Sequence, residues 1–185
     1  GVYVGITLGG PGHLNPAVTF ALAVAGIFPW DQVIPMSIAQ IAGGCTGAAI
    51  AALFYYPHFK VTGSDEGNCV GIFATGPAID NKPFNLISEI IATFMFMLAI
   101  LCLGKMADGL APMVIGILVA SIGMSFGATT GYALNPARDF GPRLAYFLLP
   151  IPNKGTANWQ YAWVPFIGPL IGAGLAVLFF QLVVP

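Results

Sequence analysis

The tetrapeptide Leu14-Asn15-Pro16-Ala17 recurs as Leu134-Asn135-Pro136-Ala137, and this repeat decides how the chain is interpreted. Asn is a favoured N-cap residue, and Pro is best tolerated at the first helical position, where its missing N–H would have no partner in any case. Each tetrapeptide therefore predicts a helix that begins at its Asn. The apolar runs Asn15 to Phe28 and Asn135 to Leu149 are only about half as long as a membrane span, at a rise of about 1.5 Å per residue. We expect two half-helices.

The composition indicates that the chain belongs in a lipid bilayer. Of its 185 residues, 57% are hydrophobic and 7% are charged, which is too little charge to solvate the surface of a soluble domain of this size. The net charge is −1 and the six Lys and Arg residues are spread along the chain, which argues against a nucleic-acid partner. The three cysteines have the spacing of neither a disulfide framework nor a metal site, and we expect no metal and no cofactor.

Four stretches are long and apolar enough to cross a hydrocarbon core roughly 30 Å thick, which takes about 20 residues. They are Val33 to Tyr56, Phe84 to Gly104, Leu110 to about Gly127, and Trp159 to Val184, and Gly1 to about Leu8 looks like the end of a fifth span. The chain has no initiator Met and no charged side chain before residue 31. We therefore expect an N-terminally truncated sequence that begins inside a membrane segment.

The polar segment 57–83 is the predicted external loop, and it separates a remnant of a first repeat, residues 1–56, from a second repeat, residues 84–185. An odd number of spans per repeat inverts the second copy relative to the first. The two half-helices then enter from opposite faces, and their N-termini meet near the bilayer midplane. Irregular backbone at that depth is tolerated only where it is buried in protein or lines a water-filled cavity. This arrangement predicts a single transmembrane channel domain.

The meeting point of the half-helices has a predictable chemistry. Two helix N-termini that face one point place roughly half a positive charge each beside the pore, which repels cations. The side-chain amides of Asn15 and Asn135 can donate hydrogen bonds to the oxygen of a passing solute, and a water molecule that accepts both relays a proton poorly. The pattern favours the passage of neutral hydroxyl compounds and the exclusion of ions.

Two longer stretches resemble the signature motifs of the major intrinsic proteins, the aquaporin and glycerol-facilitator family. His13 to Thr19 (HLNPAVT) resembles the first motif, and Gly131 to Pro142 (GYALNPARDFGP) resembles the second. The resemblance implies an all-α membrane protein with an aquaporin-like bundle of inverted repeats, here with four complete spans, the end of a fifth and two re-entrant half-helices. It also implies a homotetramer in the plasma (cytoplasmic) membrane and a passive channel for glycerol and similar polyols, with some water.

The resemblance assigns roles to residues of both motifs. The pore constriction would comprise Asn15, Pro16, Ala17, Asn135, Pro136 and Ala137. The selectivity filter would comprise Gly123, Tyr132 and Arg138. The carbonyls that face the lumen would include those of Pro11, Gly12, His13, Gly131 and Ala133.

Four residues bear on selectivity and support. Asp139 is typical of glycerol facilitators and lies four residues before Arg143, so the two can pair on one helix face. Gly123 stands where water-selective members commonly carry a histidine, which leaves room for a carbon backbone. Tyr132 replaces the Phe that is usual in glycerol facilitators and adds a hydroxyl to the filter. Glu89 is the one acid inside a predicted span; the resemblance implies that it supports a pore-loop backbone, and a proton relay is the alternative.

Glycines at a spacing of four residues predict close helix packing, and they occur at Gly43 and Gly47, Gly123 and Gly127, and Gly168 and Gly172. Three functional alternatives stay open: a water-selective channel, a channel for lactic acid or urea, and an ion-coupled secondary transporter. A transporter needs a coupling-ion site, for which the spans offer no paired acids. An enzyme needs a nucleophile beside a base, a pattern that the sequence does not display, and we expect no enzymatic activity.

Overall fold

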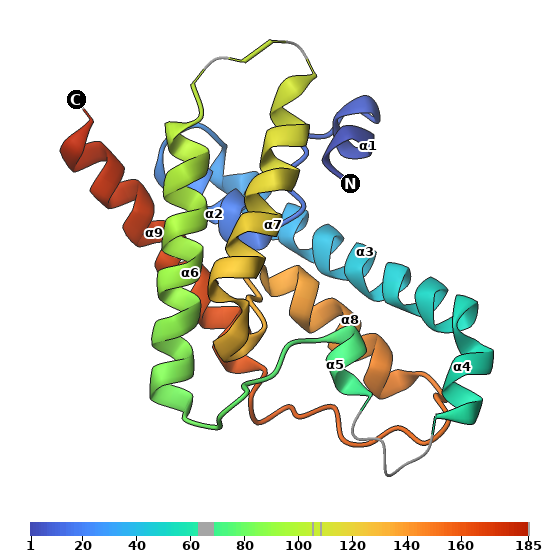
Figure 1. The fold of residues 1–185 in the computed structure, drawn as a ribbon. Helices are drawn as coiled ribbons and strands as arrows, with labels where there is room; N and C mark the ends of the chain where they lie inside the picture. The colour runs from blue at the N-terminus through green and yellow to red at the C-terminus, as the bar shows by residue number, and fades with distance from the viewer. Residues whose placement is uncertain (63–68, 105, 108, 185) are drawn as a thin grey trace.

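The computed structural model describes residues 1–62, 69–104, 106–107 and 109–184, and this part of the chain forms helices and loops without a β-strand (Figure 1). Within it, four helical segments are long and apolar enough to span a membrane. They are Trp30–Phe54, which joins the short 3-10 helix η1 (Trp30–Gln32) to α3 (Val33–Phe54), then α6 (Lys82–Cys102), α7 (Leu110–Thr130) and α9 (Trp163–Val183). The four predicted spans are confirmed, with ends that differ by a few residues. The helix α1 (Val2–Thr7) lies where the end of a fifth span was expected.

The two predicted half-helices are α2 (Pro16–Val24) and α8 (Pro136–Leu148). In each, Asn is the N-cap, its side-chain oxygen accepts a hydrogen bond from a backbone N–H of the first turn, and Pro occupies the first helical position. With 9 and 13 residues, both are shorter than the length that crosses a bilayer. The sequence therefore predicted both the start and the short length of these helices.

Each half-helix packs mainly against a long helix from the other part of the chain. α8 lies along α3, and α2 lies along α9, while α6 and α9 share the most extensive contact among the described helices (Figure 1). Because the partners are exchanged, residues before and after the loop 57–83 form one packed unit. The N-terminal ends of α2 and α8 are thereby fixed relative to each other.

Glycines of α9 allow its close approach to α6. A Cβ atom on Gly168 would lie 2.7 Å from the Cβ of Glu89, and one on Gly172 would overlap the carbonyl oxygen of Ile90. Any side chain at either position would force the two helices apart. The close packing predicted for this glycine pair is confirmed.

The pair Gly43 and Gly47 makes no close helix contact within the described part of this single chain, so the packing predicted for it stays a prediction. A Cβ on either residue would have no neighbouring atom within 4 Å. The close contact of α3 is made instead by Gly44, where a Cβ would lie 2.7 Å from the carbonyl oxygen of Ala137, and by Gly141 of α8, where it would lie 2.5 Å from the carbonyl oxygen of Ile41. Spacing alone did not indicate which glycine of the Gly43-Gly44 pair faces the neighbouring helix.

The predicted external loop 57–83 contains helical structure, although its residues 63–68 lie outside the described residues. The helix α4 (Tyr56–Val61) opens the segment, α5 (Val70–Phe73) follows, and α6 begins at Lys82. Phe59 and Phe73 are buried and stack with ring centroids 6.0 Å apart. The ring centroid of Phe73 lies 5.2 Å from that of Tyr146 in α8. The segment is thus folded onto α8, the half-helix that carries the second motif.

Candidate functional site

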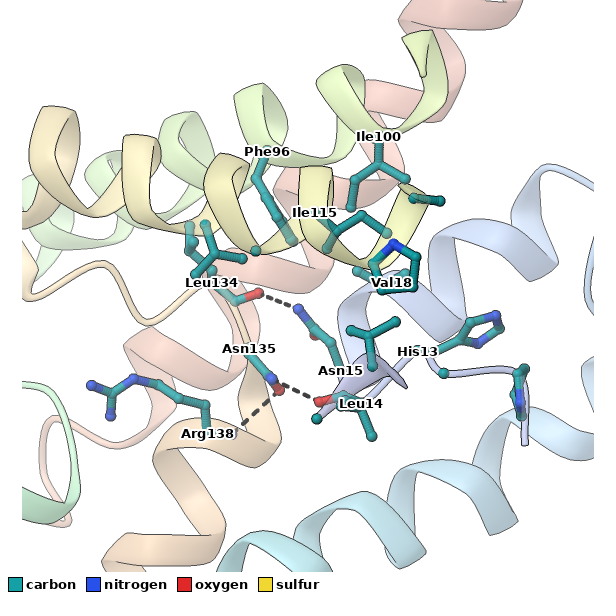
Figure 2. Close-up of a pocket in the computed structure, with 18 of the residues that line it drawn as sticks. His13, Leu14, Asn15, Val18, Phe96, Ile100, Ile115, Leu134, Asn135 and Arg138 are labelled. Carbon is teal, nitrogen blue, oxygen red and sulfur yellow. Dashed lines mark hydrogen bonds between the residues drawn. The ribbon is translucent and has the colours of Figure 1, made fainter. Parts of the chain in front are cut away.

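A cavity of about 600 Å³ lies where the two half-helices begin (Figure 2). Its walls come from α1, α6 and α7 and from the loops that lead into α2 and α8. The residues of the predicted site that line it are Pro11, Gly12, His13, Asn15, Tyr132, Ala133, Asn135 and Arg138. The fold therefore brings together residues of both motifs around one space.

The two capping asparagines are joined by reciprocal hydrogen bonds. The Nδ2 of Asn15 donates to the carbonyl oxygen of Leu134 at 2.9 Å, and the Nδ2 of Asn135 donates to the carbonyl oxygen of Leu14 at 2.8 Å (Figure 2). The Oδ1 atoms accept from the backbone N–H groups of the α2 and α8 first turns at 2.9 Å. An amide nitrogen carries two hydrogens, so each asparagine keeps one N–H that can be donated to a solute in the cavity.

The loops before the two half-helices adopt matching backbone conformations. Leu14 and Leu134 have φ angles of 49° and 56°, in the left-handed region that residues other than Gly seldom adopt. Gly12 has φ 71°, and Tyr132, at the corresponding place in the second motif, has φ 42°. The carbonyls of Leu14 and Leu134 are the acceptors of the reciprocal bonds, so these bonds hold the strained turns in place.

Gly123 lies beside the ring of Tyr132, and its filter role stays a prediction. Gly123 does not line the cavity, because the ring of Tyr132 occupies the space beside it: a Cβ on Gly123 would lie 2.9 Å from the ring atoms Cε2 and Cζ of Tyr132. A Cβ on Gly127 would lie 2.8 Å from Cδ1 of the same ring. The pair Gly123 and Gly127 therefore accommodates the Tyr132 ring against α7. The room left by Gly123 is filled by the ring of Tyr132, another residue of the predicted filter.

Five further residues of the predicted site lie away from the cavity surface. Pro16, Ala17, Pro136 and Ala137 are buried in the first turns of the half-helices. Gly131 has φ 77°, and a Cβ there would lie 3.4 Å from the side chain of Thr75. These residues shape the site through backbone conformation and packing.

Glu89 is fully buried and supports the second pore loop through three hydrogen bonds. Its carboxylate accepts from the hydroxyl of Thr130 at 2.6 Å and from the backbone N–H groups of Ala133 and Leu134 at 3.0 and 3.2 Å. Those N–H groups belong to the strained turn before Asn135, so Glu89 satisfies backbone donors that would otherwise be unpaired at membrane depth. A residue that supports the backbone of this loop has to accept hydrogen bonds from its N–H groups, as Glu89 does.

Arg138 and Asp139 follow each other but point to different places. Arg138 is exposed, lines the cavity, and donates from Nη1 to the carbonyl oxygen of Phe73 at 3.4 Å. Asp139 is buried and forms the expected ion pair with Arg143, with Nε 2.8 Å from Oδ1. Tyr161, before α9, is also buried, and burial raises the pKa of its phenol, so it stays neutral beside the pair.

The comparisons with known proteins agree with this geometry. The family model described as Major intrinsic protein matches residues 1–180. The chain belongs to the major intrinsic protein family.

Its relatives in this family include glycerol uptake facilitator proteins of bacteria. The chain is 54% identical to glycerol uptake facilitator protein 3 of Lactiplantibacillus plantarum, over 92% of this chain and 72% of the relative. It is 49% identical to the glycerol uptake facilitator protein of Bacillus subtilis, over 91% of this chain and 62% of the relative. The solved structure of the aquaglyceroporin from Plasmodium falciparum has a TM-score of 0.82 and 26% identity, and covers 95% of this chain and 74% of that chain. The chain has the aquaporin-like fold of the major intrinsic proteins.

Two features of this major intrinsic protein site were missed by the sequence analysis. One is the apolar wall of the cavity, which includes Val18, Phe96, Ile100, Ile115 and Val119. These residues lie in predicted helices and carry no signal that separates a pore wall from a lipid-facing surface. The other is the segment Phe73 to Thr75, which contacts α8 although it lies in the predicted external loop.

Proposed function

We propose that this chain forms a passive channel through which glycerol and similar small uncharged solutes cross the membrane together with some water, while ions and protons are excluded. The observation that carries the proposal is the reciprocal pairing of Asn15 and Asn135 at a cavity of about 600 Å³. The names of the relatives, glycerol uptake facilitator proteins in two bacteria, support glycerol as the solute.

The cavity offers a polyol two kinds of surface. Asn15, Asn135 and Arg138 supply N–H donors on one side, and apolar side chains such as Phe96 and Ile115 lie opposite them. A molecule with hydroxyls along one edge and CH groups along the other matches both surfaces. Polar donors that are few and well placed fix its orientation without binding it so tightly that release becomes slow.

The charges of the site disfavour ions. Among the described residues that line the cavity, Arg138 has the one Asp, Glu, Lys or Arg side chain, and its charge is positive. The half-helix N-termini add partial positive charge at the same place. A cation would therefore lose its hydration shell without gaining an anionic ligand, which is unfavourable.

The contacts of Glu89 speak against an ion-coupled transporter. A proton-coupled mechanism relies on an intramembrane acid that can exchange partners during transport. All three partners of Glu89 are groups of the protein itself, and two of them are backbone N–H groups of a pore loop. We therefore favour the passive channel.

The channel is further proposed to reside in the cytoplasmic membrane as a homotetramer. Large apolar side chains on α3 and α7 are exposed, among them Ile34, Ile38, Met113 and Ile117. Lipid, or neighbouring copies of the chain, would cover such a surface. Light scattering coupled to size-exclusion chromatography in detergent tests the tetramer, and a monomeric mass would refute it.

Permeability measurements test the channel. The purified protein is reconstituted in liposomes, and stopped-flow light scattering records volume changes with glycerol, urea, lactic acid and pure osmotic water flow. We expect glycerol permeability above that of empty liposomes, without saturation and without dependence on Na⁺ or a proton gradient. Water flux alone would favour the water-selective alternative, and gradient-dependent uptake would favour the transporter.

A further inference from the structure

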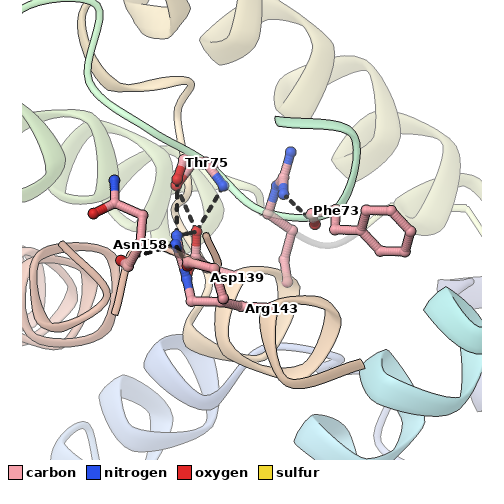
Figure 3. A network of polar contacts seen from close by, with 7 residues as sticks. Phe73, Thr75, Asp139, Arg143 and Asn158 are labelled. Atoms are coloured by element: carbon pink, nitrogen blue, oxygen red, sulfur yellow. Dashed lines mark hydrogen bonds and ion pairs between the residues drawn. The ribbon is translucent and has the colours of Figure 1, made fainter. Parts of the chain in front are cut away.

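We infer that Thr75, Asp139 and Arg143 form a positioning clamp that holds the carbonyl of Phe73 against Arg138 and so fixes the Arg138 side chain at the edge of the cavity. Figure 3 shows the network. The inference rests on the proposed channel function, because Arg138 is proposed as the donor that faces the solute. It adds three residues that do not line the cavity and that control the solute preference from outside it.

Arg143 forms the fixed base of the clamp. The side chain is fully buried, and its guanidinium has five N–H donors. Two of them bind Asp139, at 2.8 and 2.9 Å, and a third binds the carbonyl of Thr75 at 2.8 Å. The other two bind the carbonyls of Ala157 and Asn158 in the loop before α9, at 2.7 and 3.2 Å. Every donor is satisfied, so the orientation of Arg143 is strongly determined.

Asp139 passes this orientation to Thr75. Its Oδ2 accepts from both the backbone N–H and the hydroxyl of Thr75, each at 2.7 Å. Together with the bond from Arg143 to the Thr75 carbonyl, all polar groups of Thr75 are engaged. Thr75 also packs against Gly131, which directly precedes the filter residue Tyr132. Thr75, a residue of the predicted external loop, is therefore held between Asp139, which follows Arg138, and Gly131, which precedes Tyr132.

Thr75 in turn determines the position of Phe73. Only Ala74, which is itself buried, separates the two residues, so the Phe73 carbonyl has little freedom once Thr75 is held. The bond from Arg138 to this carbonyl is 3.4 Å long, near the limit for a hydrogen bond. A shift of the loop by a few tenths of an ångström away from α8 would break it. The hydrogen bond between Arg138 and the Phe73 carbonyl, which connects the network to the predicted filter, is therefore its weakest contact.

Release of the clamp has a predictable effect on solutes. A guanidinium that loses a carbonyl partner turns to other acceptors, and the cavity that Arg138 already lines is open to its side chain. The side chain would then narrow the cavity. Glycerol, which is larger than water, would be slowed more, and the ratio of water to glycerol permeability would rise.

The first experiment compares Thr75→Val with Thr75→Ser in liposomes. Val removes the hydroxyl that binds Asp139 and keeps the shape of Thr, while Ser keeps the hydroxyl. We expect Thr75→Val to raise the water-to-glycerol ratio by about threefold, which is the effect of one lost hydrogen bond, and Thr75→Ser to restore the wild-type ratio. Thr62→Val is the matched control, since its hydroxyl binds the carbonyl of His58 within an exposed turn, away from Asp139.

The second experiment detects the Arg138 side chain without relying on flux. The chain contains two arginines, Arg138 and Arg143; the first is exposed and the second is fully buried. Modification by phenylglyoxal, read by mass spectrometry of the peptides, therefore reports on Arg138. We expect Thr75→Val to accelerate the modification by about threefold, and Thr75→Ser and Thr62→Val to leave it unchanged.

A double-variant cycle identifies the route of the effect. If Thr75 acts through Arg138, Thr75→Val leaves the permeability ratio unchanged in an Arg138→Val background. An equal ratio and an equal labelling rate in Thr75→Val and wild type, or an effect that persists without Arg138, would overturn the clamp. If the wild type passes neither glycerol nor water, the proposed function fails, and the labelling rates still decide the inference.

Discussion

The half-helices α2 and α8 share one backbone plan. Both are capped by an Asn whose amide crosses to a Leu carbonyl of the opposite loop, and both loops contain a Leu in the left-handed region. The plan follows from the tetrapeptide that the two motifs share. It produces a symmetrical meeting point from segments far apart in the chain.

The two half-helices differ in the charge that follows the shared Asn. Counted from that residue, the charged positions Arg138, Asp139 and Arg143 of α8 correspond to Val18, Thr19 and Ala23 of α2. The hydroxyl of Thr19 donates to the backbone carbonyl of Asn15, accepts from Gln40 of α3 and lies 3.3 Å from Nδ1 of His13, so this point of α2 has no ion pair like that of Asp139 and Arg143. The shared Asn therefore determines the backbone of both half-helices, while the residues that follow it determine the charge that each half-helix carries. We expect the two halves to respond alike to substitution where their backbones match and differently where their side chains differ.

The largest effect is expected from the asparagines, because burial makes their reciprocal bonds unequal. Asn15→Ala leaves the carbonyl of Leu134 unpaired in a residue that is 4% exposed, whereas Asn135→Ala leaves that of Leu14, which is 44% exposed. Both variants lose a helix cap worth about 1 kcal/mol. A buried unpaired carbonyl adds about 1–3 kcal/mol. We expect Asn15→Ala to lower thermal stability in detergent more than Asn135→Ala, and the reverse order would show that the cavity does not hydrate the Leu14 carbonyl.

The next effect concerns the packing of the half-helices. A Cβ on Gly44 of α3 would lie 2.7 Å from a backbone oxygen of α8, whereas a Cβ on Gly174 of α9 would lie 3.4 Å from the ring of Phe20 in α2. Backbone in a packed helix cannot move aside, but a ring edge can. We expect Gly44→Ala to destabilise the fold by about 1–3 kcal/mol and Gly174→Ala by much less.

Fluorescence-detected size-exclusion chromatography after heating measures this difference. Gly43→Ala is the control for Gly44→Ala, because a Cβ on Gly43 meets no atom within 4 Å. Equal melting of Gly44→Ala and Gly43→Ala would mean that α3 and α8 are not in the close contact described above.

A smaller effect is expected from Arg138→Val, which gives α8 the residue that α2 carries at the corresponding position. The variant removes the one Asp, Glu, Lys or Arg side chain among the described residues that line the cavity. We expect leakage of ions or protons to rise by about tenfold, which corresponds to a barrier lowered by about 1.4 kcal/mol. A pH-sensitive dye inside proteoliposomes measures it, and a proton leak equal to that of the wild type would assign charge exclusion to the asparagines and helix ends alone.

The sequence predicted those parts of the molecule that depend on local backbone chemistry. Asn at the N-cap, Pro at the first position and an apolar run of limited length are enough to predict a half-helix, and both were found where expected. Apolar length likewise predicted the four spans. The pairing of Asp139 with Arg143 was predictable because both lie on one helical face.

Contacts between distant segments could not be predicted in the same way. Which glycine of Gly43 and Gly44 meets α8 depends on the rotation of α3 about its axis, which helix propensity does not fix. The attachment of Thr75 to Asp139 joins residues 64 positions apart. The place of the Tyr132 ring depends on a left-handed turn at Tyr132 itself and on two glycines of α7. The division into two repeats stays an inference from the sequence.

The smallest effect is expected where the loop before α8 has an aromatic residue of the predicted filter and the loop before α2 has none. Tyr132 corresponds to Gly12 of the first motif, and its ring rests on Gly127, where a Cβ would lie 2.8 Å from Cδ1. Gly127→Ala pushes the ring toward the cavity that Tyr132 lines, so glycerol permeability should fall by about twofold, a change of about 0.4 kcal/mol in the barrier, and water permeability by less. Gly47→Ala, which meets no atom within 4 Å, should change neither. Because the change acts through the ring, it should disappear in a Tyr132→Ala background, and a loss of glycerol flux that survives there would mean that Gly127 affects the pore by the packing of α7 alone.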